Sequence, residues 1–221
     1  AGTIAAQSVS HYSNQGLKIL VIDRNPSNLP GMKSTAGWIC GDAVSKEAVD
    51  FMTNRIKVNW SEPEIEYKVK GVMAFSPDRE TSIPFDGAGY MLNRQVLPQR
   101  QNERTLAMGV DFDFEINLTG LLYDGNQVIG VQGIDYKTKT PYKKIAKVVI
   151  DATGMTSMLR NQISNTTKME RKVDRKDVES TGRHIMYFEQ GEEDLTEFDP
   201  DYCIIHLDQD IAPGGYGWVF P

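Results

Sequence analysis

The feature that most constrains the fold of this chain is a short apolar run that directly follows a helix of small residues. Residues 1–13 are compatible with a helix, and residues 17–23 (LKILVID) form a β-branched run. Such runs are typical of strands buried in a parallel sheet, and a helix followed by a buried strand is the second half of a βαβ unit. We expect Gly16 to end the helix in the left-handed conformation. The chain is therefore predicted to be α/β.

A second type of segment follows the first strand. Residues 26–42 are rich in Pro, Gly, Ser and Asn and predict a loop, whereas residues 43–57 are compatible with a helix. Residues 65–70 (IEYKVK) then alternate polar and apolar side chains, which is typical of antiparallel strands. The sequence thus predicts a nucleotide domain interrupted by a second, mostly antiparallel domain. The nucleotide domain is assigned residues 1–57 and 90–163, and the second domain residues 58–89 and 164–221.

The later part of the chain predicts one helix and several strands. Residues 94–108 suit a helix, with Pro98 tolerated in its first turn, and Asp124-Gly125 is a hairpin signal. The chain lacks an initiator Met and opens inside a helix, so we expect a fragment that is truncated at both ends and lacks the first strand of its nucleotide domain. Strands are predicted at residues 110–114, 118–123, 128–136, 147–151, 203–207 and 217–220.

Composition excludes several classes of protein. The 24 Lys and Arg residues against 30 Asp and Glu give a net charge of −6, and 40 % of the residues are hydrophobic. A disordered chain is thereby excluded, and nucleic acid is not expected as a partner because phosphate binding needs a basic face. Two cysteines are too few for a disulfide framework, and no apolar run approaches the roughly 20 residues of a membrane span, so we expect a cytoplasmic protein. No metal site is predicted, because the three histidines share no ligand spacing.

The opening residues match half of a dinucleotide-binding motif. Such a motif needs a glycine-rich turn at a helix N-terminus, where free N–H groups meet the pyrophosphate, and an acidic residue at the end of the next strand. Ala1 and Gly2 fit the tail of the glycine turn, and Asp23 lies 21 positions after Gly2, near the expected spacing of about 20. The alternative is that Ala1 and Gly2 are merely a cut end and that Asp23 is a turn residue.

Two further segments could carry chemistry. Cys40 lies in a loop just before a predicted helix, where N–H groups favour a thiol that exchanges a proton, although a free cysteine is more often a small buried hydrophobe. Residues 213–221 (PGGYGWVFP) gather aromatic side chains that could line an apolar pocket, with core packing as the alternative.

Taken together, these segments resemble the geranylgeranyl reductase family of FAD-dependent flavoproteins, and its archaeal-lipid branch in particular. Ala1-Gly2 with LVID at residues 20–23 resembles the FAD-binding βαβ unit of that family. CGDA at residues 40–43 is similar to its Cys-Gly-acidic-Gly loop. Two more matches follow in the family's order: the first combines two segments, and the second is the most specific match. They are GYMLNR at residues 89–94 with VIDATGMTS at 149–157, and residues 212–221, which are similar to Pro-x-Gly-Tyr-x-Trp-x-Phe-Pro.

The resemblance implies a Rossmann-like FAD-binding domain of the hydroxylase-like flavoprotein type. It implies an enzyme that saturates double bonds of geranylgeranyl chains, in archaeal-type membrane lipids or prenyl diphosphates, by hydride from reduced FAD plus a proton. It also implies an isoprenoid lipid substrate, an electron donor (ferredoxin, a deazaflavin or a nicotinamide) and peripheral contact with the inner face of the cell membrane. Cys40 is the candidate catalytic proton donor. Candidate FAD-binding residues are Ala1, Gly2, Asp23, Cys40, Gly41, Ala43, Arg94 and Leu118, and candidate substrate residues are Tyr216, Trp218 and Phe220.

The sequence departs from the family pattern at several positions and leaves two alternatives open. Ala43 replaces a glycine, Thr153 stands where the wider flavoprotein group often has Asp, and Gln101 and Arg104 fall on the expected apolar face of their helix. One alternative is an FAD-dependent monooxygenase or halogenase of the same fold, which does not need a thiol in the cysteine loop. The other is a flavin-free lipid-binding module, against which the acidic strand end and the arginine of GYMLNR both argue.

Overall fold

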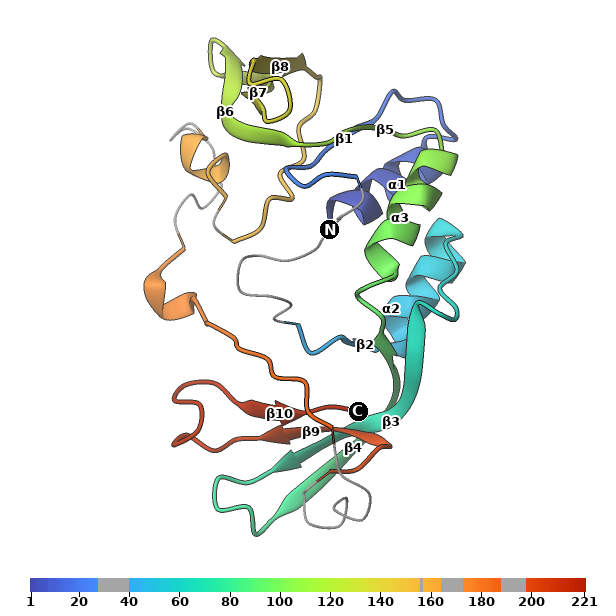
Figure 1. Ribbon diagram of the computed structural model, residues 1–221, viewed down its shortest axis with the longest axis vertical. Helices are drawn as coiled ribbons and strands as arrows, with labels where there is room; N and C mark the ends of the chain where they lie inside the picture. The colour runs from blue at the N-terminus through green and yellow to red at the C-terminus, as the bar shows by residue number, and fades with distance from the viewer. Residues whose placement is uncertain (28–39, 156, 164–172, 188–197) are drawn as a thin grey trace. The chain divides into compact units, whose positions relative to one another are not determined.

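The helix and strand predicted at the start of the chain are present in the computed structural model (Figure 1). Helix α1 spans Gly2–Tyr12, and strand β1 spans Leu20–Ile22 and pairs in parallel with β5, Asp111–Asp113. Because parallel strands cannot be joined by a tight hairpin, this pair confirms the α/β part of the prediction. The structure describes residues 1–27, 40–155, 157–163, 173–187 and 198–221.

The chain folds into two compact units, and each is built from two separate stretches of sequence. The first unit comprises Ala1–Met32 and Pro98–Val178, and the second comprises Lys33–Leu97 and Glu179–Pro221. Residues 40–57, which the sequence assigned to the nucleotide domain, therefore pack with the second unit. The functional assignment of the two domains stays a prediction.

The end of α1 differs from the sequence prediction. Ser13 is the C-cap in right-handed conformation, and the next two residues, Asn14 (φ 50°) and Gln15 (φ 58°), are left-handed. Asparagine tolerates this conformation better than most residues, since its short polar side chain can hydrogen-bond locally. The prediction that Gly16 fills this place is wrong, because the chain has already reversed before it reaches the glycine.

A polar seam joins α1 to helix α3, Leu97–Ala107. The Gln7 side chain, fully buried, donates from Nε2 to Thr105 Oγ1 at 2.9 Å, and Ser10 Oγ donates to the carbonyl of Met108 at 2.7 Å. Gln101, whose position argued against a helix in the sequence, is 4 % exposed and hydrogen-bonds to Gln7. The predicted helix is thus confirmed as α3. Its buried face is polar because the face of α1 that packs against it is polar as well.

A three-stranded antiparallel sheet completes the first unit. Its strands are β6, Ile116–Asp124, β7, Gln127–Asp135, and β8, Pro141–Ile145, in that order. The β6–β7 hairpin turns at Gly125 with φ 56°, which confirms the Asp124-Gly125 signal. The strand β8 was not predicted, because only Tyr142 and Ile145 in it carry large apolar side chains.

The strand predicted at residues 147–151 is absent. The segment has no strand assignment, and Val148 and Ile150 are 76 % and 59 % exposed. The last contact of the ladder is from the N–H of Ala146 to the carbonyl of Ile129 at 2.9 Å. A β-branched run supplies strand propensity but not a partner, and no strand among the described residues pairs with this segment.

The second unit is built on a five-stranded sheet with the order β10-β9-β3-β4-β2. All neighbours are antiparallel except β3 and β9, which run parallel. Val69, Met91 and Cys203 form the core of this sheet, and Val72 and Phe220 pack against them. The sheet confirms the antiparallel prediction for this part of the chain. Its strands are β2, Ala43–Ser45, β3, Ile65–Phe75, β4, Ser82–Leu92, β9, Tyr202–His206, and β10, Gly217–Val219.

The helix predicted at residues 43–57 starts later than expected. Its first three residues form β2, and Ser45 then caps helix α2, Lys46–Phe51, by accepting from the N–H of Ala48. A π-helical turn, Met52–Ile56, continues it, and short 3-10 turns lie at Arg160–Gln162 and Arg175–Asp177. Over the residues that the structure describes, none of the helices has both the length and the apolar character needed to cross a lipid bilayer.

Replacing Thr105 with valine removes the Oγ1 atom from the α1–α3 seam and keeps the shape of the side chain. The free energy of unfolding should fall by about 1–2 kcal/mol, because the buried Gln7 amide loses its shorter hydrogen bond. Urea denaturation measures this change. Thr119→Val is the matched control, since Thr119 is exposed and its replacement should change stability by less than about 0.5 kcal/mol. Equal losses in the two variants would contradict the role of the seam.

Candidate active site

Two of the sequence motifs meet at one edge of the second unit's sheet. Strand β2 begins within CGDA and pairs with the end of β4, so that Ala43 lies opposite Met91 and Ser45 opposite Gly89. The N–H of Leu92 donates to the carbonyl of Asp42 at 2.9 Å and extends this ladder toward the cysteine. The strand pairing therefore places the cysteine loop next to the residues that follow β4.

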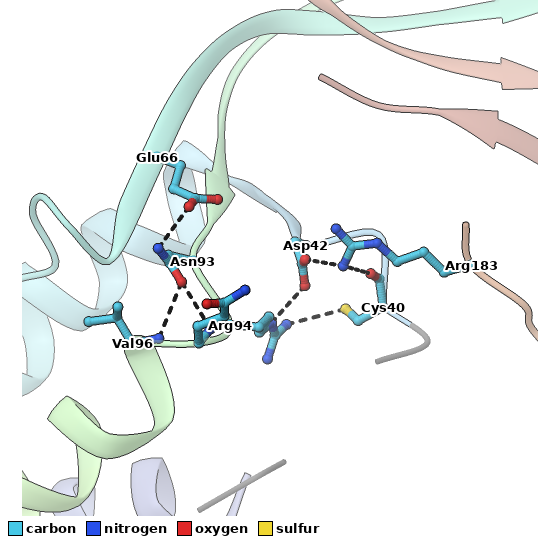
Figure 2. Close-up of polar contacts among 8 residues, drawn as sticks. Cys40, Asp42, Glu66, Asn93, Arg94, Val96 and Arg183 are labelled. Carbon is cyan, nitrogen blue, oxygen red and sulfur yellow. Dashed lines mark hydrogen bonds and ion pairs between the residues drawn. The ribbon is translucent and has the colours of Figure 1, made fainter. Parts of the chain in front are cut away.

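The turn after β4 holds Arg94 in place through its neighbour Asn93 (Figure 2). Asn93 Oδ1 accepts from the backbone N–H groups of Gln95 and Val96 at 2.9 and 3.2 Å. Asn93 Nδ2 donates to a carboxylate oxygen of Glu66 on β3 at 2.7 Å. An asparagine side chain that hydrogen-bonds to the backbone N–H groups two and three residues later fixes a turn. The backbone of Arg94, which lies within this turn, is therefore fixed.

Two arginines converge on the carboxylate of Asp42 in this loop. Arg94 Nε donates to Asp42 Oδ1 at 3.0 Å, and its Nη2 lies 3.3 Å from the sulfur of Cys40. Arg183 Nη1 donates to Asp42 Oδ2 and also to the backbone carbonyl of Cys40 at 2.8 Å. The Asp42 side chain is only 8 % exposed, so water solvates its carboxylate little. The two guanidinium groups compensate its charge instead. The cluster carries one net positive charge beside an exposed thiol.

The cysteine loop lies directly on the aromatic end of the chain. A Cβ built on Gly41 would come within 2.7 Å of Cε2 of Phe220 and 3.3 Å of Nε1 of Trp218. Only a residue without a side chain permits this approach. The rings of Trp218 and Phe220 lie 6.1 Å apart, and the ring of Tyr216 lies 6.1 Å from that of Trp218. The fold therefore brings the cysteine loop together with the aromatic residues predicted from sequence.

The aromatic residues continue an apolar face of the sheet. Residues two apart on a strand share a face, as do residues directly opposite on paired strands. Trp218 lies opposite Ile205, Cys203 beside Val72, and Val72 opposite Phe85. Phe85 is 58 % exposed, so the face is not closed at that end. Cys203 is a buried core residue of this face, and its burial raises the pKa of the thiol to about 11. The face thus comprises Phe85, Val72, Cys203, Ile205, Trp218 and Phe220.

The remaining candidate FAD-binding residues lie in the first unit. Ala1 is the N-cap of α1 and contributes no side-chain cap, and a Cβ on Gly2 would lie 3.4 Å from Cβ of Ala152. The start of α1 therefore lies against the VIDATGMTS segment. Asp23 follows β1, and its Oδ1 accepts from the N–H of Asn25 at 2.9 Å. Leu118 on β6 is half-buried.

The VIDATGMTS segment folds on its own aspartate. Asp151 Oδ1 accepts from the N–H and the hydroxyl of Thr153 at 3.0 and 2.6 Å, and Oδ2 accepts from the hydroxyl of Ser157. Burial raises the pKa of Asp151, but the hydrogen bonds from Ser157 and Thr153 outweigh it and leave the pKa below its ordinary value. Thr153, the departure noted in the sequence, thus serves as a partner for Asp151.

One residue of the cluster, Arg183, was missed in the sequence. It lies in a highly charged stretch, and such stretches are usually solvated surface. Periodicity and spacing give no sign that this arginine reaches a loop about 140 residues earlier, since that contact depends on tertiary structure alone.

Comparisons of the sequence with known proteins point to one family. Residues 177–221 match the model of the geranylgeranyl reductase catalytic domain. Over 225 residues the chain is 32 % identical to the digeranylgeranylglycerophospholipid reductase of Sulfolobus acidocaldarius, with all of this chain and 45 % of that protein covered. The chain thus spans about half the length of the curated relatives that it matches.

Solved structures show the same fold. A geranylgeranyl bacteriochlorophyll reductase-like protein from Thermoplasma acidophilum superimposes with a TM-score of 0.72 at 23 % identity, and covers all of this chain and 50 % of its own. A myxobacterial FAD-dependent halogenase, the chondrochloren halogenase, gives a TM-score of 0.56 at 15 % identity, over 72 % of this chain and 37 % of its own. The match to the Sulfolobus reductase over all of this chain, together with the matching catalytic-domain model, shows that the chain resembles the geranylgeranyl reductase family.

Proposed function

We propose that the protein is a flavin-dependent reductase that saturates double bonds of geranylgeranyl chains in isoprenoid membrane lipids. The observation that supports this most is the contact of the cysteine loop with the aromatic end of an apolar sheet face. A polar thiol cluster on an apolar surface suits an isoprenoid chain, which offers no polar group along most of its length. The relatives carry the name of such a reductase, and the halogenase resemblance reflects the fold alone.

For each unit by itself, we assign to its candidate residues the part of FAD that their chemistry suits. In the first unit, the first turn of α1 has no side-chain cap, so its N–H groups remain available to a pyrophosphate. Asp23 there would accept the ribose hydroxyls. In the second unit, Arg94 and the backbone of Cys40, Gly41 and Ala43 would contact the flavin ring. Leu118 would contribute through its backbone.

Reduced FAD, when bound, supplies the hydride for one carbon of the alkene. The other carbon needs a proton, and we assign this proton to the thiol of Cys40. Arg94 donates its hydrogen bond to the sulfur, so the S–H proton is not used in that contact. The thiolate that remains lies beside the cationic cluster, and the exposure of Cys40 lets solvent return the proton.

The apolar face would hold the isoprenoid chain against this proton donor. Trp218 and Phe220 lie at the end that contacts the cysteine loop, and Phe85 lies on β4, two strands away from β9. Burying apolar chain on such a face contributes about 25 cal/mol for each Å² removed from water. Tyr216, 47 % exposed, lies next to Trp218 and would cover the chain from outside.

Replacing Cys40 with serine tests the proton donor in the full-length protein that carries this chain. A hydroxyl is a far weaker acid than a thiol, so kcat for anaerobic reduction of a geranylgeranyl lipid should fall about 100-fold, the usual scale for loss of a general acid. The flavin absorbance of the purified protein should be unchanged. Unaltered turnover would remove the thiol from the mechanism. An oxygenated or halogenated product in a parallel aerobic assay, with no saturated product in the anaerobic one, would overturn the proposed reaction.

Replacing Gly41 with alanine tests the contact between the cysteine loop and the aromatic end. The new Cβ would clash with Phe220, and the free energy of unfolding should fall by about 1–3 kcal/mol, the usual cost of overpacking. Gly87→Ala on β4 is the matched control, because nothing lies within 4 Å of a Cβ there. A double-mutant cycle with Phe220→Leu should show strong coupling to Gly41→Ala. Equal stability of the two alanine variants would show that the loop does not lie on these rings.

A further inference from the structure

Arg183 joins its segment of the chain to the cysteine loop. Among residues 173–187, Arg183 alone is half-buried, and all the others are exposed. Its immediate neighbours have no helix or strand assignment. Its guanidinium contacts the cysteine loop, and Arg183 lies within the region of the sequence that matches the family model.

The guanidinium of Arg183 closes a ring of contacts around Cys40 (Figure 2). It donates to the backbone carbonyl of Cys40 and to one oxygen of Asp42. The other oxygen of Asp42 accepts from Arg94, whose second nitrogen reaches the sulfur of Cys40. The ring thus contacts the cysteine at its backbone carbonyl and at its sulfur. Because Asp42 binds both Arg183 and Arg94, the position of one arginine affects the position of the other.

The burial of the Asp42 carboxylate makes this support necessary, since a buried charge needs partners. Asp42 has φ 65°, in the left-handed region that is uncommon for residues other than glycine. Without Arg183, one oxygen of the carboxylate would lose its ion pair. Arg94 would then be the remaining ion-pair partner of the Asp42 carboxylate. Its guanidinium would shift toward that carboxylate, and its contact with the sulfur of Cys40 would change.

We propose that Arg183 is a positioning residue that orients Cys40 and Arg94 and gives the thiol a cationic surrounding. The catalytic consequence, support for proton donation by Cys40, rests on the proposed function. The positioning itself is a property of this chain without flavin or lipid. It is therefore measurable even if the proposed reaction is wrong.

The test compares the alkylation of Cys40 by an anionic and a neutral reagent, iodoacetate and iodoacetamide. The ratio of the two rates reports the local positive charge, because any change in exposure or in the thiolate population affects both rates alike. Peptide mass spectrometry distinguishes Cys40 from Cys203, which is buried and whose pKa is raised to about 11, so that it stays unlabelled near neutral pH. Circular dichroism verifies that each variant is folded.

The variants are chosen to separate charge, contact and location. Arg183→Gln should lower the iodoacetate-to-iodoacetamide ratio about two- to threefold, as expected for loss of one partly exposed unit charge. Arg183→Lys should keep the ratio, because a single nitrogen of Arg183 makes both contacts and an ammonium group can replace it. Arg175→Gln removes an exposed arginine that lies in the first unit and should leave the ratio unchanged.

The ratio also decides against the proposal when it does not follow this pattern. An unchanged ratio in Arg183→Gln, or an equal fall in Arg175→Gln, would show that Arg183 does not act on the thiol. A fall of the ratio in Arg183→Lys as large as that in Arg183→Gln would show that a single cationic nitrogen is not what positions Cys40. That result would also overturn the assignment of Arg183 as a positioning residue.

Discussion

The candidate site depends on one carboxylate, that of Asp42, which is buried between two arginines. Each oxygen of Asp42 accepts from a different guanidinium, and each of these arginines also contacts Cys40. A buried carboxylate without such partners would be costly, so the arrangement of both arginines follows from the position of Asp42. That position is set in turn by the pairing of β2 with β4.

The sheet connects this charged cluster to an apolar surface. Gly41, one residue before Asp42, lies against Phe220 because it has no Cβ, and Phe220 packs on the core of Val69, Met91 and Cys203. The charged cluster and the apolar face are thus joined through one loop. This arrangement matches the needs of alkene reduction, in which a proton must reach a carbon that lies in an apolar surrounding.

Much of this could be predicted from residue patterns, and the failures have physical causes. The parallel pair β1–β5 follows from the β-branched run, and the β6–β7 hairpin from Asp124-Gly125, because both signals are local. The strand expected at residues 147–151 failed because the sequence shows propensity but not the partner that a strand needs. Likewise the polar buried face of α3 follows from Gln7 on another helix. The role of Arg183 depends entirely on a long-range contact, which no local signal reveals.

We propose that the cysteine loop and the aromatic sheet face form one site for a reduced flavin and an isoprenoid chain. A crystal structure of the full-length protein with FAD and a geranylgeranyl lipid would test this. We expect the flavin ring against residues 40–43 and the lipid chain across Trp218 and Phe220, with an alkene carbon within reach of the Cys40 sulfur. A lipid chain bound away from these rings, with the thiol facing no alkene, would contradict it.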